Sequence, residues 1–341
     1  MPGLWWRTVR VHGPELGGQT DGSKLRRLFC PVTGHTPGSS VLWAAPQPYS
    51  ERLRLTMLME PSDPLRMTSL RLDKGVTGYS FCWDNYVIAL KAHSHREDLS
   101  YYKYIMSSHP HALWLHIPLR PRERITEIWQ RRRKHGRELA LIAVTNIDRI
   151  CVMGAYPKSC WHLSSYDLLY KAQPDKGSFF IDESPAGIRA VASGPLAGGT
   201  VARRLPTALS PYPESMPFED YLYTMASVEN VTHVRLCRAK SDSIITGLVF
   251  KYTDGHQECV GQTRLDCLED STMIDVSRKM WLRISRSPYG FPQVVDMGVS
   301  PTSKSGGEYL YITWHGILEW WFSLNQCRLY HNGQASLSTR L

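Results

Sequence analysis

Residues 139–154 read Leu139-Ala-Leu-Ile-Ala-Val-Thr-Asn-Ile-Asp-Arg-Ile-Cys-Val-Met-Gly154. An apolar run of strand length comes first, a polar turn follows, and a second apolar run returns and ends at a glycine. This pattern predicts a β-hairpin, because apolar runs of this length bounded by turn residues are typical of buried strands.

A second segment, residues 246–261, aligns with the first without a gap. Leu141 falls on Leu248, Ile142 on Val249 and Gly154 on Gly261. The upstream segments 125–129 and 231–235 align with a shift of one residue. Either the chain carries an internal repeat of strand, loop, strand, turn and strand, or two unrelated hairpins share a common pattern. A repeat would bury the apolar face of each unit against its neighbour.

The rest of the chain also favours strands. β-branched and aromatic residues suit a half-buried sheet surface, and they predict strands over 53–59, 179–181, 187–191, 280–284, 309–314 and 318–330. Short helices are expected at 87–93 and 99–106, and a helical turn at 218–226. We therefore expect a mainly β protein, with a hairpin-built, β-prism-like or sandwich-like body and a few short helices near its N-terminal third.

Three segments resemble strands of the jacalin-related β-prism lectins. They are Glu123-Arg-Ile-Thr-Glu-Ile-Trp129, Ala140-Leu-Ile-Ala-Val-Thr-Asn146 and Gly187-Ile-Arg-Ala-Val191. Residues 118–335 also resemble a group of fungal proteins, some of which carry an F-box. The resemblance implies a β-prism fold and binding of a glycan or a protein. The glycine-rich turn and the late Gly-x-x-x-Asp loop of the lectin sugar site are not both found in register.

Composition shifts divide the chain into five stretches. Residues 1–50 are rich in Gly, Pro, Ser and Thr and are expected to form a flexible extension. Residues 51–117 form a mixed α/β lead-in, and 118–192 a first β-hairpin unit. Residues 193–217 are rich in Pro and Gly and predict a linker or long loop, and 218–341 form a second β-hairpin unit.

Basic residues exceed acidic ones by 40 to 31, and many of them lie within 120–137. This basic stretch, which includes Arg131, Arg132 and Arg133, either contacts an anionic partner or is a solvated loop tip. The eight cysteines have wide, irregular spacings that do not suit a zinc ribbon. With no signal peptide and no apolar run long enough to span a membrane, we expect free thiols and a cytoplasmic or nuclear location.

The two predicted hairpin turns supply candidate ligand-binding residues: Asn146 and Asp148 in the first, Asp254 and His256 in the second. Side chains of this kind hydrogen-bond sugar hydroxyls, although turn geometry alone also selects them. Trp320 and Trp321 are adjacent and therefore face opposite sides of a strand. One is expected in the core, and the other is either covered or exposed as a partner contact.

Histidines gather at His93, His95, His109, His111 and His116, where they form either a metal site or a polar surface. Motifs for phosphate binding, nucleophile elbows and zinc proteases are absent, and no cofactor is expected. The leading hypothesis is a non-enzymatic binding module with lectin-like recognition. The alternatives are a protein-interaction scaffold, such as the substrate-facing part of a ubiquitin-ligase adaptor, and an enzyme of an unrecognised class.

Overall fold

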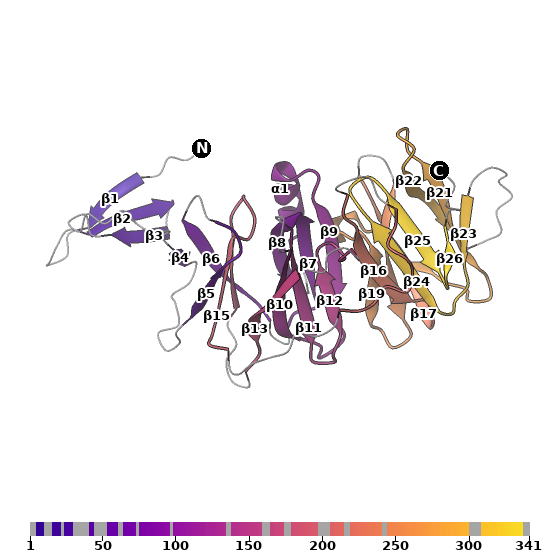
Figure 1. Cartoon of the computed structure of the whole chain (residues 1–341), viewed down its shortest axis with the longest axis horizontal. Helices are drawn as coiled ribbons and strands as arrows, with labels where there is room; N and C mark the ends of the chain where they lie inside the picture. Colours follow the sequence, from indigo (N-terminus) through magenta and orange to yellow (C-terminus); the bar gives the residue numbers. More distant parts are fainter. Residues whose placement is uncertain are drawn as a thin grey trace. The chain divides into compact units, whose positions relative to one another are not determined.

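The computed structural model describes the side chains of residues 53–60, 64–72, 75–95, 98–133, 138–158, 164–173, 179–196, 205–214, 219–240, 244–299 and 308–336, together with the backbone of four strands within 1–50. These residues are mainly β, as predicted, and form antiparallel sheets with one short α-helix (Figure 1). The chain divides into two compact units. Unit 1 comprises Met1–Arg71 and Pro174–Ala197, and unit 2 comprises Leu72–Gln173 and Gly198–Leu341.

Unit 1 contains two sheets, one ordered β1-β2-β3 and one ordered β4-β6-β14-β15-β5. Its described strands are β1 (Trp5–Val9), β2 (Leu16–Asp21), β3 (Lys24–Phe29), β4 (Val41–Trp43), β5 (Arg54–Met57), β6 (Leu65–Leu70), β14 (Phe179–Asp182) and β15 (Ala190–Ser193). A buried ion pair connects the turn after β14 to the sheet: Nε of Arg189 lies 2.7 Å from Oδ2 of Asp182. The backbone N–H of Arg66 donates to the same carboxylate at 2.6 Å, so β6 is held as well.

The first part of unit 2 holds the sheets β8-β7-β9 and β12-β11-β10-β13. Their elements are β7 (Gly78–Asp84), β8 (Tyr86–His93), α1 (Ser100–Ser108), β9 (Leu113–Pro118), β10 (Ile125–Arg133), β11 (Leu139–Thr145), β12 (Ile150–Met153) and β13 (Ser164–Lys171). All seven residues of β11 are buried, which explains its continuous apolar run. Helix α1 connects β8 to β9 (Figure 1). Its Tyr102 packs against Trp114.

The second part of unit 2 holds the sheet β16-β24-β25-β26 and a larger sheet ordered β20-β17-β18-β22-β21-β23, with β19 paired to β18. Their elements are β16 (Leu222–Ser227), β17 (Val231–Arg238), β18 (Ile245–Tyr252), β19 (Gln257–Gly261), the 3₁₀ turn η1 (Leu265–Cys267), β20 (Thr272–Met273), β21 (Met280–Arg286), β22 (Pro292–Gly298), β23 (Glu308–Ile312), β24 (Ile317–Phe322), β25 (Cys327–His331) and β26 (Gln334–Ala335).

Two helix predictions were wrong. Residues 87–93 lie in strand β8, because Asn85 adopts a φ of 58° and turns the chain back so that β8 pairs with β7. Residues 222–227 form strand β16, which pairs along its whole length with β24. In both cases the partner strand decides the conformation, since short apolar segments fit a helix or a strand equally well. The helix expected at 99–106 is confirmed as α1.

The two hairpins aligned in the sequence have the same register. Leu141 pairs with Met153 and Leu248 with Val260, so both partners in the second hairpin lie 107 positions later. The upstream strands β10 and β17 correspond with an offset of 106. Each carries a bulge at the same place, between Ile125 and Glu127 in β10 and between Val231 and His233 in β17. The three strands of one unit therefore match those of the other, apart from a second bulge between Cys237 and Arg238 that the first unit lacks.

The glycine that ends each hairpin makes the same kind of close contact. Gly154 and Gly261 both have positive φ, 145° and 77°. A side chain on Gly154 would meet Ala140 and the indole of Trp83, and one on Gly261 would meet Gly247 and the indole of Trp320. Since glycine alone leaves room here, each hairpin approaches a tryptophan from the neighbouring sheet.

The unit boundaries differ from the predicted domains. Strands β14 and β15 pair with β6 and β5 in unit 1, although they were expected in a hairpin unit spanning 118–192. The predicted linker 193–217 has a described part, residues 205–214, that lies against β24. Of the predicted flexible extension 1–50, the structure describes only the backbone of β1 to β4, and the rest lies outside the described residues.

Candidate functional site

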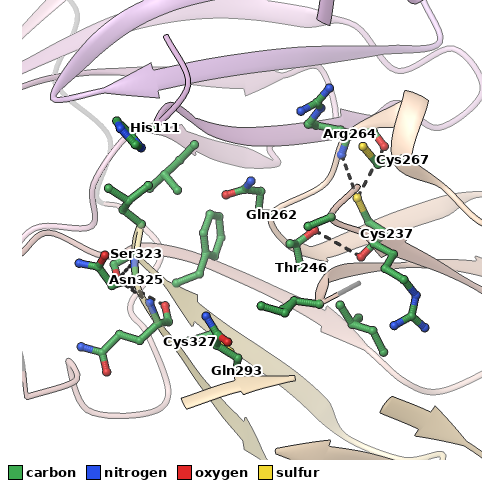
Figure 2. A pocket seen from close by; sticks show the side chains of 18 of the residues that line it. His111, Cys237, Thr246, Gln262, Arg264, Cys267, Gln293, Ser323, Asn325 and Cys327 are labelled. Atoms are coloured by element: carbon green, nitrogen blue, oxygen red, sulfur yellow. Dashed lines mark hydrogen bonds between the residues drawn. The ribbon is translucent and has the colours of Figure 1, made fainter. Parts of the chain in front are cut away.

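Unit 2 contains a cavity of about 540 Å³. Its volume falls in the range of about 300–1,000 Å³ typical of small-molecule sites. Four parts of the chain form it: residues 106–113 at the end of α1 and start of β9, the ends of β17 and β18 with residues 262–267, strand β22, and the β24–β25 turn. Figure 2 shows His111, Gln262, Gln293 and Asn325 around the cavity, one from each part.

In the first hairpin unit the corresponding place is filled. Arg131 there corresponds to Cys237, Glu138 to Ile245 and Ala155 to Gln262. Arg131 is fully buried, pairs with Glu138 at 2.5 Å and donates to the carbonyl of Ala155 at 2.6 Å. The second unit has a thiol and an isoleucine in place of this ion pair, and its space remains open as the cavity.

The tryptophans beside the two glycines differ in whether their indole N–H is hydrogen-bonded within the protein. Nε1 of Trp83 donates to the carbonyl of Leu139 at 2.9 Å. The corresponding carbonyl in the second unit, that of Thr246, instead accepts from the backbone N–H of Gln262 at 2.8 Å. Among the described residues Nε1 of Trp320 has no hydrogen-bond partner. An unused buried donor therefore lies in a residue that lines the cavity.

Four neutral amide side chains line the cavity. The side-chain amides of Gln262, Gln293 and Asn325 have no hydrogen-bond partner within the part of the chain that the structure describes. The amide of Gln326, by contrast, donates to Glu219 at 2.8 Å. Because an amide offers both donors and an acceptor, three such groups around one space suit a ligand with several hydroxyl groups.

The cations of the wall are neutralised by the protein itself. Arg264 and Lys240 lie 2.8 and 2.9 Å from Oδ2 of Asp266, and Arg238 pairs with Glu269. Burial opposes the ionisation of Asp266, but hydrogen bonds from Arg264 and Lys240 outweigh it and lower its pKa. The cavity therefore carries little uncompensated charge, which favours a neutral ligand over an anion.

Three thiols line the same cavity. Burial raises the pKa of Cys237, that of Cys267 to about 11 and that of Cys327 to about 12. Figure 2 shows Cys237 held by Arg264, whose backbone N–H donates to its sulfur at 3.3 Å. Thiols with raised pKa values are poor nucleophiles at neutral pH, so these side chains supply packing and not thiolate chemistry.

The two adjacent tryptophans face opposite sides of β24, as predicted, but both are fully buried. Trp320 lines the cavity with Phe322. Trp321 packs among the rings of Tyr156, Tyr212 and Tyr223, with centroid distances of 5.1, 5.2 and 4.5 Å. Neither side chain is exposed for a partner contact, because the described segment 205–214 covers one face and β18–β19 the other.

The basic stretch is largely a strand and not a loop tip. Arg131, Arg132 and Arg133 end β10 and pair with β13. Arg131 is buried and cannot meet a partner, whereas Arg132 and Arg133 are part-exposed. Residues 134–137, the end of the basic stretch 120–137, lie outside the described residues.

The first predicted turn site supports the backbone. Oδ1 of Asn146 accepts the N–H of Arg124 at 2.8 Å, and its Nδ2 donates to the carbonyl of Arg122 at 3.3 Å. Asp148 has a φ of 60°, and its N–H donates to the carbonyl of Thr145. Asn and Asp are common in such turns because they tolerate this conformation, so both residues have a structural reason to be here.

The second turn site forms an internal cluster. The ring of His256 stacks on Tyr252, with centroids 4.1 Å apart and planes 2° from parallel. Nδ1 of His256 lies 2.5 Å from Oδ1 of Asp254, and this hydrogen bond lowers the pKa of Asp254. None of the four predicted turn residues lines the cavity.

Two of the predicted histidines do meet, in the buried interior of the sheet β8-β7-β9. Oγ of Ser80 lies 2.8 Å from Nε2 of His93 and 3.1 Å from Nδ1 of His116, and 2.6 Å from the hydroxyl of Tyr102. Among the described residues no group of three or more His, Cys, Asp or Glu side chains is arranged to hold a metal ion.

The chain matches no protein-family model, and a search of curated proteins finds no similar sequence. No helix among the described residues has the length and hydropathy needed to cross a membrane.

The amides, thiols and aromatic residues of the cavity were missed at the level of sequence. They lie at separate positions between residues 237 and 327, and no linear motif connects them. The available signal was the aligned repeat: Cys237 and Gln262 stand where the first unit has Arg131 and Ala155.

Proposed function

We propose that the protein is a non-enzymatic binding module that takes a neutral, polyhydroxylated ligand of the saccharide class in the cavity of about 540 Å³. The observation that carries this proposal is the convergence of Gln262, Gln293 and Asn325 on one space in which the cations are already paired. Hydroxyl groups of a sugar would satisfy these amides, and the apolar faces of its ring would pack on Phe322.

The repeat supports this assignment of the site. We infer that the two hairpin units are copies of one ancestral unit, since their registers and bulges match. One copy has a buried Arg131–Glu138 pair, and the other has an open cavity at the corresponding place. The resemblance to jacalin-related lectins points to the same ligand class, but at a place other than the hairpin turns.

A protein-interaction scaffold is the second candidate, and one observation favours it. An open hollow of about 860 Å³ is lined by Met273 and Val276, which are 73% and 65% exposed, next to Arg278 and Lys279. Exposed apolar side chains beside charged ones are typical of protein contacts. Six free thiols among the described cysteines support a reducing compartment, the cytoplasm or nucleus.

A glycan array probed with the full chain tests the proposal. We expect saturable binding that the free sugar competes away, weakened about tenfold or more by Gln262→Ala or Gln293→Ala. Gln334→Ala is the matched control, because Gln334 is exposed and lies outside the cavity. A folded protein that binds no glycan would remove the saccharide proposal. Binding lost with Asp254→Ala but not with Gln262→Ala would move the site back to the hairpin turn.

A further inference from the structure

A second cavity of about 270 Å³ lies between strands β9, β12, β16 and β19 of unit 2. It shares no lining residue with the cavity described above. Its wall is mostly apolar and includes Leu115, Ile117, Ile150, Val152, Met225 and Ile317. Apolar cavities take apolar molecules, and an enclosed one of about 150 Å³ is large enough for benzene.

The charged groups at this cavity are compensated within the protein. Nε of Arg149 pairs with Glu123 at 2.8 Å, and its Nη2 donates to the carbonyl of Pro118 at 2.6 Å. Glu258 pairs with Arg120 at 2.9 Å and accepts the hydroxyl of Tyr252 at 3.2 Å. A charged ligand would lose its hydration here and find no unpaired counter-charge, so a neutral one is favoured.

The hydroxyl groups of the wall are also committed elsewhere. Tyr156 donates to the carbonyl of Pro206 at 2.9 Å, and Tyr223 donates to Oε1 of Glu319 at 2.6 Å. Oγ1 of Thr224 donates to the carbonyl of Trp320 at 3.2 Å. Since these groups are already satisfied, a sugar would gain few hydrogen bonds in this cavity. Its ligand therefore belongs to a different chemical class from that of the first.

Aromatic rings form one side of the cavity. Tyr156 and Tyr223 stand edge to face, with centroids 5.3 Å apart and planes at 64°, and both contact Trp321. Rings held in this arrangement offer faces and edges on which another ring packs favourably. The hydrogen bonds of the two tyrosines hold the rings in place before any ligand arrives.

We propose that this cavity is a binding site for a free small molecule that is neutral and aromatic and has one or two rings. The volume sets the size of the ligand, the paired Arg149 and Glu258 exclude a charge, and the tyrosine rings select an aromatic body. The site is independent of the saccharide proposal, because the two cavities have separate walls.

The test uses the full chain and 6-fluoroindole, a neutral two-ring probe observed by ¹⁹F NMR. We expect saturable line broadening that Val152→Trp abolishes, because the larger side chain fills the cavity. Val295→Trp is the matched control, since Val295 is similarly part-exposed but lines neither cavity. Tryptophan amide carries an indole ring on a charged chain. Its affinity should be lower than that of 6-fluoroindole by a factor of about ten or more.

A second readout does not depend on the folding of a variant. Cys151 and Cys259 line this cavity, whereas Cys267 lines the other one. Burial raises the pKa values of these three thiols, so the reaction is followed at alkaline pH. Bound 6-fluoroindole should slow modification of Cys151 and Cys259 by the neutral reagent 4,4′-dithiodipyridine and leave the rate at Cys267 unchanged. Absence of broadening at millimolar protein and probe would overturn the proposal. So would broadening without thiol protection, or protection that extends equally to Cys267.

Discussion

The guanidinium of Arg131 lies 2.5 Å from the carboxylate of Glu138, and both side chains are buried. In the first hairpin unit this pair fills the space that corresponds to the cavity of the second unit. A buried ion pair is costly to break, because removing one partner leaves the other charge uncompensated in the interior.

Arg131→Met is therefore expected to reduce the free energy of unfolding by about 3–5 kcal/mol. The double variant Arg131→Met/Glu138→Leu should recover much of that loss, since it removes both charges. Urea denaturation of the full chain measures both. The part-exposed neighbour Arg132 provides the control, and an equal effect of Arg132→Met would contradict a special role for the buried pair.

Gly261 and Gly255 separate the effect of backbone conformation from that of close packing. Both have positive φ, 77° and 86°. A Cβ on Gly261 would lie 2.5 Å from the carbonyl oxygen of Thr246, whereas a Cβ on Gly255 would meet nothing within 4 Å. Gly255→Ala is expected to cost about 1–2 kcal/mol from conformation alone, and Gly261→Ala about 2 kcal/mol more. Similar unfolding midpoints for the two variants would refute the close approach of Gly261 to Thr246 and Trp320.

His116 gives the protein an acid-sensitive element. Burial, with a smaller contribution from His93, lowers the pKa of His116 to about 3 from an ordinary value of 6.5. The unfolded chain takes up a proton below pH 6.5 while the folded chain does not. Stability from this residue is therefore fully present above pH 6.5 and falls as the pH drops towards 3, by at most about 1.4 kcal/mol per pH unit.

The measurement is the free energy of unfolding between pH 4 and 7 for the parent chain and for His116→Gln. The variant should show a shallower fall, although lowered carboxyl pKa values, such as those of Asp254 and Asp266, leave part of the slope in place. Identical slopes would mean that His116 titrates normally.

Glu319 attaches the segment 205–214 to β24. Its Oε1 accepts hydrogen bonds from the N–H of Leu209, from the N–H and hydroxyl of Ser210, and from the hydroxyl of Tyr223, at 2.6–3.0 Å. Glu319→Ala is expected to cost about 3 kcal/mol and to speed proteolysis within 205–214. The exposed Glu229, which accepts one bond from Gly316, is the control. Unchanged cleavage in Glu319→Ala would show that this segment is held by packing alone.

Much of the fold was accessible from the sequence, because strands buried on both faces leave continuous apolar runs. Strand β12 has the bounds that its pattern predicts, and the Asp254-Gly255 turn follows from the conformations these residues allow. Strand β8 was misread as a helix because the turn at Asn85 was not recognised. For β16 the deciding partner is β24, which lies far along the chain, so no local pattern contains it.

The candidate site was harder to predict from the sequence than the fold. Asn146 and Asp254 stood out as polar turn residues, yet their side chains support the backbone. Asn146 accepts the N–H of Arg124 in the segment before β10, and Asp254 accepts the N–H of His256 in its own turn. Gln262 and Gln293 carry no local signal, since an isolated glutamine has no preferred role. Only the packing of β19 against β24 and of β22 against β25 makes them part of one cavity.

The path of the chain between the two units limits how the protein can be divided. Residues 174–197 belong with Met1–Arg71, although unit 2 supplies the sequence on both sides of them. A fragment that begins at residue 118 would include β14 and β15 without β6 and β5, their strand partners. Two strand edges and a buried face containing Phe180 would then be left uncovered, which favours aggregation. Truncation experiments should therefore replace residues 174–197 with a short Gly-Ser connection when unit 2 is expressed alone.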